Sequence, residues 1–236
     1  MNNKTDPVHI AYFSDVLCVW AYTAQIRLDE LKREFGPKIE LTYHFIPIFG
    51  CTDNRIGEGW KARGDYQGFG QHVLEVCKSF PHVQAHPQIW TRNIPKTSAS
   101  GHLFLKAVQL LEQTEEISPN PVTDFNGRSL FEEAVWRLRQ IFFRDARNVA
   151  TEACQLELAE DLKLPIHSIQ EKLRNGEAIA AMCRDLELRD EFKVEGSPTY
   201  ILNEGRQKLY GNLGYKILEA NIREILDRPE GLASWC

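Results

Sequence analysis

The sequence has no long hydrophobic run. None of its apolar stretches approaches the ~20 residues that a membrane-spanning helix needs, so we expect no contact with the membrane interior. Residues 1–7 are polar and lack the apolar core of a secretion signal. Basic residues are not in excess, since 28 Lys and Arg face 33 Asp and Glu for a formal net charge of −5, which argues against nucleic-acid binding. We therefore predict a cytoplasmic protein that binds neither membrane nor nucleic acid.

The cysteines form no Cys-x-x-Cys pair. A reducing compartment and a chain of 236 residues both argue against a disulfide scaffold. Most of the thiols are expected to be small, buried apolar side chains, and only Cys18 has a local context that indicates chemistry. The six positions are Cys18, Cys51, Cys77, Cys154, Cys183 and Cys236.

The hydrophobic pattern of the N-terminal part predicts a strand, a helix and a second strand. Val8 to Phe13 is a short apolar run, and Ile39 to Ile46 alternates and is rich in strand formers. Between them, apolar residues recur every three or four positions up to Gly36, as on one face of a helix. Two strands joined by one helix of this length indicate a βαβ unit with parallel strands and a right-handed crossover.

The middle of the chain is predicted to be helical, and strands return only near its end. A helix fits residues 69–80, and amphipathic helices follow around 98–111, 130–142, 151–162, 166–173 and 177–192. A hairpin at 199–210 and an amphipathic helix at 217–226 come last. We predict an α/β fold, βαβ then ββα, in which residues 1–49 and 186–236 form one domain and residues 50–185 a long, mostly helical insertion.

Cys18 lies where the first strand gives way to the first helix, in the stretch Ser-Asp-Val-Leu-Cys-Val-Trp-Ala-Tyr at 14–22. Backbone N–H groups at a helix N-terminus are unpaired and the helix dipole is positive there, so we expect this thiol to ionise more easily than a free one. Asp15 either caps the helix or tunes the pKa of the thiol, and capping is favoured. The alternative is that Cys18 is a buried, inert thiol in a fold without catalysis.

Two segments give the sequence its resemblance to a known family. Asp15, Cys18, Trp20 and Tyr22 match the pattern Asp-x-x-Cys-Pro-Trp-Cys-Tyr, and Val-Glu-Gly-Ser-Pro-Thr-Tyr at 194–200 is similar to Val-x-Gly-x-Pro-Thr-Phe. The chain thereby resembles the DsbA-like branch of the thioredoxin superfamily, particularly its FrnE-like members. The resemblance implies a thioredoxin-like fold with a cis Pro198 facing the reactive thiol. It also implies that the backbone of Ser197 holds an extended substrate in the manner of strand addition.

Ala21 departs from that family, because it stands where the second, resolving cysteine belongs. A single Cys18 thiolate still forms a mixed disulfide, but an external thiol such as glutathione must then release it. We therefore predict a thiol-dependent oxidoreductase with one active-site cysteine. Its expected partners are peptide or small-molecule thiols and disulfides, with glutathione as a candidate co-substrate and no permanently bound cofactor.

Two other functions stay open. The chain also resembles 2-hydroxychromene-2-carboxylate isomerases and kappa-class glutathione transferases, which carry a serine where Cys18 stands and activate the thiol of bound glutathione. In such an isomerase or transferase, Trp60, Phe69 and Trp90 are candidates to line a pocket for a partly aromatic electrophile, although core packing is the simpler interpretation. The third function is a non-catalytic binding or holdase protein that uses the same groove. A homodimer is a candidate assembly.

Further candidate site residues follow from the resemblance and from topology. Trp20 is a candidate for an apolar lip beside the thiol. Asn212 and Tyr215, around the start of the last helix, resemble the place where glutathione-using relatives hold the glutamyl end of the ligand, and a helix N-terminus offers a physical reason. Cys51 follows the second strand, which ends at the same sheet edge as the first, so it is the best-placed candidate for a resolving thiol.

Two other clusters of polar residues have more than one interpretation. His82 and His86 have the spacing of zinc ligands on a helix, with Cys77 nearby, but Pro81 and Pro87 bracket the segment and we predict no metal site. A basic cluster is predicted to be a solvated helix face, with binding of a carboxylate-bearing substrate as the alternative. It comprises Arg137, Arg139, Arg144, Asp145 and Arg147.

Overall fold

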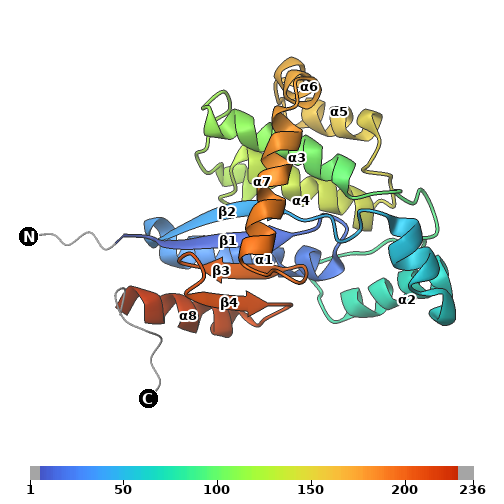
Figure 1. Ribbon diagram of the computed structural model, residues 1–236, viewed down its shortest axis with the longest axis horizontal. Helices are drawn as coiled ribbons and strands as arrows, with labels where there is room; N and C mark the ends of the chain where they lie inside the picture. Colours follow the sequence, from blue (N-terminus) through green and yellow to red (C-terminus); the bar gives the residue numbers. More distant parts are fainter. Residues whose placement is uncertain (1–5, 228–236) are drawn as a thin grey trace, which may run out of the picture.

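A four-stranded mixed sheet forms the centre of the protein in the computed structural model, which describes residues 6–227 (Figure 1). β1 (Val8–Ser14) and β2 (Ile39–Phe45) are parallel. β3 (Thr199–Leu202) is antiparallel to β1, and β4 (Gln207–Tyr210) is antiparallel to β3. The strand order is β2-β1-β3-β4, so β1 is an interior strand and delivers the residues that follow it to the middle of one sheet end.

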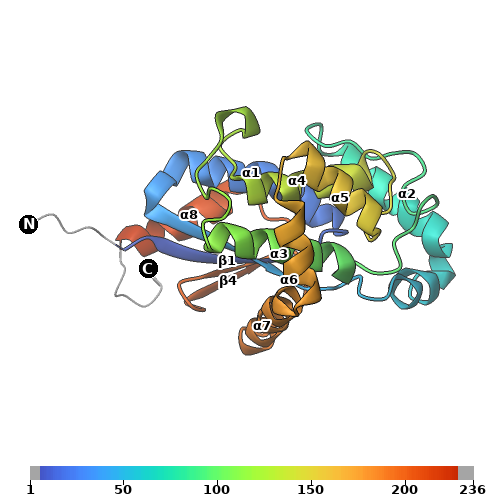
Figure 2. The ribbon, with the colours of Figure 1, turned by 90° about the horizontal axis from the view of Figure 1, so that it is seen from above.

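Helices cover both faces of the sheet. α1 (Val19–Phe35) and α8 (Tyr215–Asp227) lie on one face and α7 (Glu177–Glu191) lies on the other, as the view from above shows (Figure 2). On the α7 face, a small apolar cluster formed by Phe13, Ile46, Val194 and Ile201 is buried beneath the helix. The remaining core is one continuous cluster that joins the sheet, α1 and the helical insertion.

The helical insertion follows β2. It opens with a π-helical turn at Asp53–Glu58, and its helices are α2 (Asp65–Lys78), α3 (Ala99–Gln113), α4 (Leu130–Phe143), α5 (Glu152–Asp161) and α6 (Ile166–Arg174). α4 begins with a capping box in which Ser129 and Glu132 exchange hydrogen bonds, as the local sequence favours. In Figure 1, α3 to α6 gather on the β2 side of the sheet, whereas α2 lies at the end towards which β1 runs.

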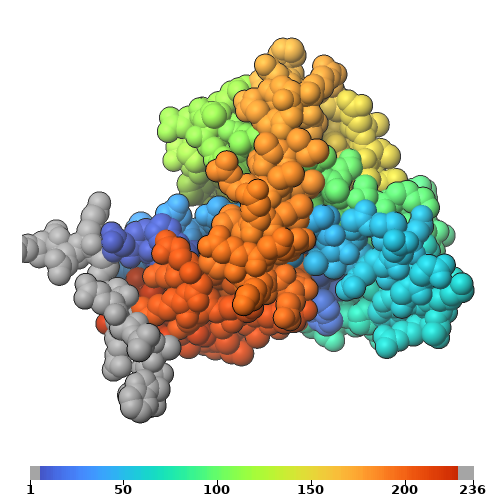
Figure 3. Space-filling view, in the orientation of Figure 1, coloured from blue at the N-terminus to red at the C-terminus, as the bar shows by residue number. Residues whose placement is uncertain are grey.

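α7 passes without a break from the helical insertion to the sheet and crosses the front of the molecule in Figure 3. The domain boundary predicted between 185 and 186 falls within this helix. Asp185 fixes α7 to its neighbours: its carboxylate accepts the backbone N–H of Phe45 at 2.8 Å, and it lies 2.8 Å from His44 Nδ1 and 2.9 Å from Lys106 Nζ. The helical and sheet parts are therefore joined by buried ionic contacts.

The predicted thioredoxin-like fold, βαβ then ββα around a helical insertion, is confirmed. The predicted hairpin turn is present, and Asn203 and Glu204 adopt φ values of 43° and 54° before Gly205 at 99°. Such positive φ angles suit the tight turns that join antiparallel strands. Among residues 6–227, no helix is both long enough and apolar enough to span a membrane.

Candidate active site

Cys18 is the residue immediately before α1, at the position that the sequence indicated. Its φ and ψ of −83° and 116° are extended, and the helix starts at the next residue. The Ser197–Pro198 peptide bond is cis, and Cys18 Sγ lies 3.2 Å from the carbonyl oxygen of Ser197. Ser197 Oγ in turn accepts a hydrogen bond of 2.9 Å from the backbone N–H of Asp15. The two segments that carry the sequence resemblance therefore meet in space.

Burial dominates the ionisation of Cys18. The residue is only 6% exposed, and its burial raises the pKa of the thiol above the ordinary value. The Ser197 side chain and the backbone N–H groups of Ala21 and Trp20 lower this pKa, whereas the charge of Asp15 raises it. The expectation that Cys18 ionises more easily than a free thiol is thus wrong for this structure. The helix N-terminus acts in the expected direction, but the loss of hydration outweighs it.

Asp15 does not cap α1, contrary to the favoured interpretation. Its buried carboxylate accepts hydrogen bonds from the backbone N–H groups of Leu17 at 2.8 Å and Phe49 at 2.9 Å, and from Ser98 Oγ at 2.7 Å. The bond to Leu17 closes a local turn, as aspartate commonly does two residues ahead. Asp15 therefore ties the turn that carries Cys18 to the segment after β2 and to the start of α3.

Cys18 lines a cleft of about 380 Å³ between the end of the sheet and the helical insertion. The β1–α1 junction and the Ser197 loop supply one side, and the segment after β2, the π-helical turn and α2 supply the other. The lining residues are Cys18, Val19, Trp20, Ile48, Phe49, Arg55, Trp60, Phe69, His72, Glu195, Gly196, Ser197 and Tyr210.

The aromatic candidates divide between this cleft and the core. Trp20, Trp60 and Phe69 lie on the cleft wall. Trp90 does not, because it is fully buried and its ring packs against Phe49 and Phe69 with centroid distances of 5.5 Å and 5.4 Å. Three of the four aromatic candidates thus line the cleft, and Trp90 packs behind Phe69.

Four polar residues of the cleft were not predicted as site residues, one of which is Glu195 in the Ser197 loop. Arg55 comes from the π-helical turn, His72 from α2 and Tyr210 from the end of β4, and no pattern in the sequence links them. Burial, with the charge of Arg63 nearby, lowers the pKa of His72 and favours its neutral form. Gly196 is the sequence feature that makes room for Tyr210. A Cβ at position 196 would lie 2.7 Å from Tyr210 Oη, so only glycine lets the tyrosine ring approach the Ser197 loop this closely.

Pro198 itself does not line the cleft, and three other predicted residues also lie outside it. Cys51 is exposed and does not line it, so its role as a resolving thiol stays a prediction. Asn212 accepts a hydrogen bond from Arg27 of α1, and Tyr215 begins α8; the structure brings neither together with Cys18. The five cysteines among residues 6–227 are free thiols, and Cys236 lies outside the described residues.

The histidine segment has other partners than a metal. His82 Nε2 lies 3.0 Å from the carbonyl oxygen of Thr23, and His86 Nδ1 accepts the backbone N–H of Gln88 at 3.0 Å. Burial raises the pKa of Cys77 to about 11, which disfavours the thiolate that binds metals. Within residues 6–227, no three His, Cys, Asp or Glu side chains gather in a way that would hold a metal ion.

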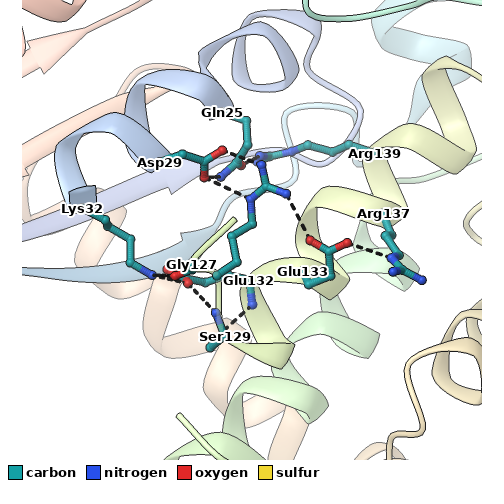
Figure 4. A network of polar contacts seen from close by, with 10 residues as sticks. Gln25, Asp29, Lys32, Gly127, Ser129, Glu132, Glu133, Arg137 and Arg139 are labelled. Carbon is teal, nitrogen blue, oxygen red and sulfur yellow. Dashed lines mark hydrogen bonds and ion pairs between the residues drawn. The ribbon is translucent and has the colours of Figure 1, made fainter. Parts of the chain in front are cut away.

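The basic cluster is only partly a solvated face. Three of its arginines pair with carboxylates of the same chain: Arg137 with Glu133, Arg144 with Asp145, and Arg147 with Glu157. The prediction is wrong for Arg139, which is fully buried and donates to Gln25 Oε1 at 3.0 Å (Figure 4) and to Ser14 Oγ at 2.9 Å. Arg139 therefore joins α4 to α1 and β1 beneath the site.

Solved structures share this fold at low sequence identity. A proposed protein disulfide isomerase from Nitrosomonas europaea is 14% identical, with a TM-score of 0.70 over 95% of this chain and 100% of its own. The cytosolic disulfide reductase DsbM from Pseudomonas aeruginosa, solved with and without GSH, is 17% identical, with a TM-score of 0.62 over 91% of this chain; the structure with GSH is covered to 99%.

A 2-hydroxychromene-2-carboxylate isomerase is similar as well, at 16% identity and a TM-score of 0.58 over 96% of this chain and 100% of its own. No protein-family model and no curated protein sequence matches the chain. The chain therefore has the fold of DsbA-like thiol-disulfide oxidoreductases and of this isomerase. At these identities the likeness establishes the fold, and the chemistry has to be argued from the site.

Proposed function

We propose that the protein is a thiol-disulfide oxidoreductase with Cys18 as its only active-site thiol and glutathione as the thiol that releases it. The carrying observation is the position of Cys18: its sulfur lies before the first turn of α1 and 3.2 Å from the Ser197 carbonyl, on the wall of a cleft. Ala21 stands one turn further on, where a second thiol would resolve the intermediate. The fold of DsbM, a cytosolic disulfide reductase solved with GSH, supports the co-substrate and a cytoplasmic setting.

The reaction consists of two thiol-disulfide exchanges. With a mixed disulfide of a peptide and glutathione, the Cys18 thiolate attacks the glutathione sulfur, and the peptide thiolate leaves and takes a proton. A free glutathione thiolate then attacks the sulfur of the glutathione bound to Cys18. Oxidised glutathione leaves and the Cys18 thiolate is restored. The peptide gains two electrons and its proton, and the two glutathione sulfurs end in one disulfide.

Ser197 couples substrate binding to the release of the thiol. In the resting structure the Cys18 S–H donates to the Ser197 carbonyl, which only the neutral thiol can do. A substrate backbone N–H that bonds to the same carbonyl by strand addition takes the place of the S–H. The thiolate then keeps the interactions that lower its pKa, from the Ser197 side chain and the N–H groups of Ala21 and Trp20.

The aromatic walls of the cleft favour one second candidate function. Trp20, Trp60 and Phe69 offer flat apolar surfaces, and Arg55 adds a cation. Together with the fold of the chromene-carboxylate isomerase, this lining suits a glutathione-dependent isomerase or transferase that acts on a partly aromatic electrophile. In that reaction the thiol of bound glutathione is the nucleophile, so Cys18 does not form a disulfide.

The test is glutathione-dependent reduction of a glutathionylated peptide by the wild-type chain, Cys18→Ser and Cys51→Ser. We expect Cys18→Ser to lower the rate by about a hundredfold or more, because it removes the nucleophile. Cys51→Ser serves as the matched control and should keep the rate if glutathione, and not Cys51, resolves the intermediate. A Cys18→Ser protein with full activity would overturn the proposal.

A second measurement separates the two functions. In a variant that keeps Cys18 and replaces the other five cysteines, the pH dependence of alkylation is recorded with and without an unreactive form of the peptide that has serine in place of the glutathionylated cysteine. The oxidoreductase requires peptide to shift alkylation to lower pH. If Cys18→Ser instead retains glutathione binding and turns over an aromatic electrophile, the isomerase or transferase takes precedence.

A further inference from the structure

A second groove, of about 1180 Å³, lies along the outer edge of β2 and shares no lining residue with the cleft of Cys18. One wall is α1, and the other is α3 with the loop at 119–129 that leads into α4. Residues 39–43 of β2 lie at its base. Figure 4 shows part of the wall, where Lys32, Ser129 and Glu132 meet. The groove is thus separate from the proposed oxidoreductase site.

The backbone of β2 is open in this groove. The carbonyl of Tyr43 accepts from Gln109 Nε2 at 3.1 Å and the N–H of Phe45 donates to Asp185, so alternate residues of β2 turn their backbone groups away from β1. Leu41 belongs to the same set. Within residues 6–227 no hydrogen bond takes up its N–H or C=O, because β2 is the end strand of the sheet. An open edge of this kind is a template for pairing with an extended chain.

Two acceptor side chains of α3 line the same groove. Gln109 and Glu112 are three residues apart and therefore lie on one helix face. Gln109 is only 5% exposed; its Nε2 is bound to Tyr43, and its Oε1 has no hydrogen-bond partner among the described residues. Glu112 Oε1 is buried without a partner as well. Buried acceptors of this kind are costly unless a donor reaches them, so the groove is short of donors.

The charges of the groove point to a cationic donor. Its three cations are already paired: Lys32 with Glu132, Arg33 with Glu30, and Arg128 with Asp29. No ion pair among the described residues includes Glu112, and Glu40 is paired only with His9. Burial raises the pKa of Glu112, and the Ser129 side chain, the charge of Lys32 and the backbone of Phe131 only partly offset it, so a further cation beside Oε1 would favour the ionised form. Lysine and arginine side chains carry donors and positive charge and no acceptor.

We propose that this groove binds an extended peptide segment that adds to the edge of β2 and places a lysine or arginine side chain against Gln109 and Glu112. The peptide backbone pairs with the N–H and C=O of Leu41, in the mode of strand addition. The cationic side chain donates to Gln109 Oε1 and Glu112 Oε1, which the protein itself leaves unpartnered. Binding does not involve Cys18.

The test is fluorescence anisotropy with a labelled, capped peptide, Thr-Val-Arg-Val-Thr, on wild-type protein, Glu112→Gln and Glu187→Gln. Glu187 is exposed on α7 and lines neither the groove nor the cleft of Cys18. Glu187→Gln removes the same charge as Glu112→Gln and is therefore the matched control. We expect Glu112→Gln to weaken binding by about tenfold, because a charge-assisted hydrogen bond is lost. Glu187→Gln and Cys18→Ser should leave the affinity unchanged, which keeps this test independent of the oxidoreductase proposal.

Two altered peptides test the proposal on the wild-type protein, so these tests do not depend on the folding of a variant. The peptide with glutamate in place of arginine should lose binding, and so should the arginine peptide with N-methylated backbone amides. Equal binding by the glutamate peptide, or by Glu112→Gln, overturns the cationic subsite. Equal binding by the N-methylated peptide, or by arginine amide alone, overturns strand addition.

Discussion

The position of Cys18 at the start of α1 has two opposite effects on the pKa of its thiol. The start of α1 offers N–H groups that stabilise a thiolate, while the packing of the β1–α1 junction removes the water that would solvate it. Burial is the larger effect on the pKa. The resting protein therefore holds a protected thiol, and under the proposed mechanism the substrate activates it by taking over the Ser197 carbonyl.

Asp15→Asn tests this balance. The thiol pKa of Cys18 is raised first by burial and further by the charge of Asp15, so removing that charge should shift Cys18 alkylation to lower pH. The amide also cannot accept from Leu17, Phe49 and Ser98 at once, so we expect a loss of about 1–3 kcal/mol in the free energy of unfolding. Alkylation rates against pH and urea unfolding measure the two effects.

Ser98→Ala is the matched control for Asp15→Asn. It removes one hydrogen bond to the carboxylate but keeps the charge. Stability should fall while the alkylation profile stays close to that of the wild type. An Asp15→Asn profile that coincides with the wild type would show that Asp15 has only a structural role.

Among the secondary-structure elements, α7 connects the two parts of the molecule. It crosses from the insertion to the sheet, and its Asp185 receives the backbone N–H of Phe45 and the side chains of His44 and Lys106. These groups are almost completely buried, so each depends on the others for its hydrogen bonds. Removing one partner leaves the others without compensation.

Asp185→Asn should therefore lower the free energy of unfolding by about 3–5 kcal/mol. Burial lowers the pKa of Lys106 and Asp185 opposes that lowering. In the folded variant the pKa of Lys106 falls further. The unfolded chain then keeps the Lys106 proton to a higher pH than the folded chain, so the stability of the variant rises with pH. The difference in the free energy of unfolding between Asp185→Asn and the wild type should become smaller as the pH approaches the ordinary lysine pKa of 10.5.

Urea unfolding at several pH values measures this effect. The double variant Asp185→Asn with Lys106→Met keeps one acceptor for the Phe45 N–H and His44 but removes the uncompensated ammonium group, so it should be more stable than Asp185→Asn alone. A deficit that is independent of pH would show that Lys106 is not the group left uncompensated.

For the whole molecule, the continuous core predicts a single unfolding transition. One apolar cluster includes β1, α1, α2, α3 and α4, and α7 adds the buried contacts of Asp185. We expect urea curves from tryptophan fluorescence and from far-ultraviolet circular dichroism to coincide, because no part can lose its packing alone. Two separated transitions would show instead that the insertion is an independent folding unit.

Much of the fold could be predicted because its signals are local. Alternation marks β2, apolar spacing of three or four marks α1 and α4, and a glycine-containing segment at 203–206 marks the hairpin turn. The positions of Cys18 and Pro198 were visible as short patterns at the ends of strands. The segments of Cys18 and Pro198 meet because they adjoin β1 and β3, which are neighbouring strands of the sheet.

The cleft itself could not be predicted in this way. Arg55 lies in a segment without clear periodicity, and His72 lies in a helix whose place in the fold the sequence does not indicate. Both line the cleft of Cys18 because this part of the insertion is placed at the end of the sheet. Arg139 has the sequence neighbours of a surface residue, yet it is buried against Ser14 and Gln25. Each assignment depends on contacts between distant segments.

The sequence by itself therefore determined the elements, their order and the two chemical segments, because propensity, periodicity and turn geometry act between near neighbours. Only the tertiary structure decided which charges are buried, that Asp15 binds Phe49 and Ser98 instead of capping α1, and that Cys18 is held as a thiol with a raised pKa. The reason is that solvation depends on everything packed around a group, and the surroundings of Cys18 come from segments far apart in the chain.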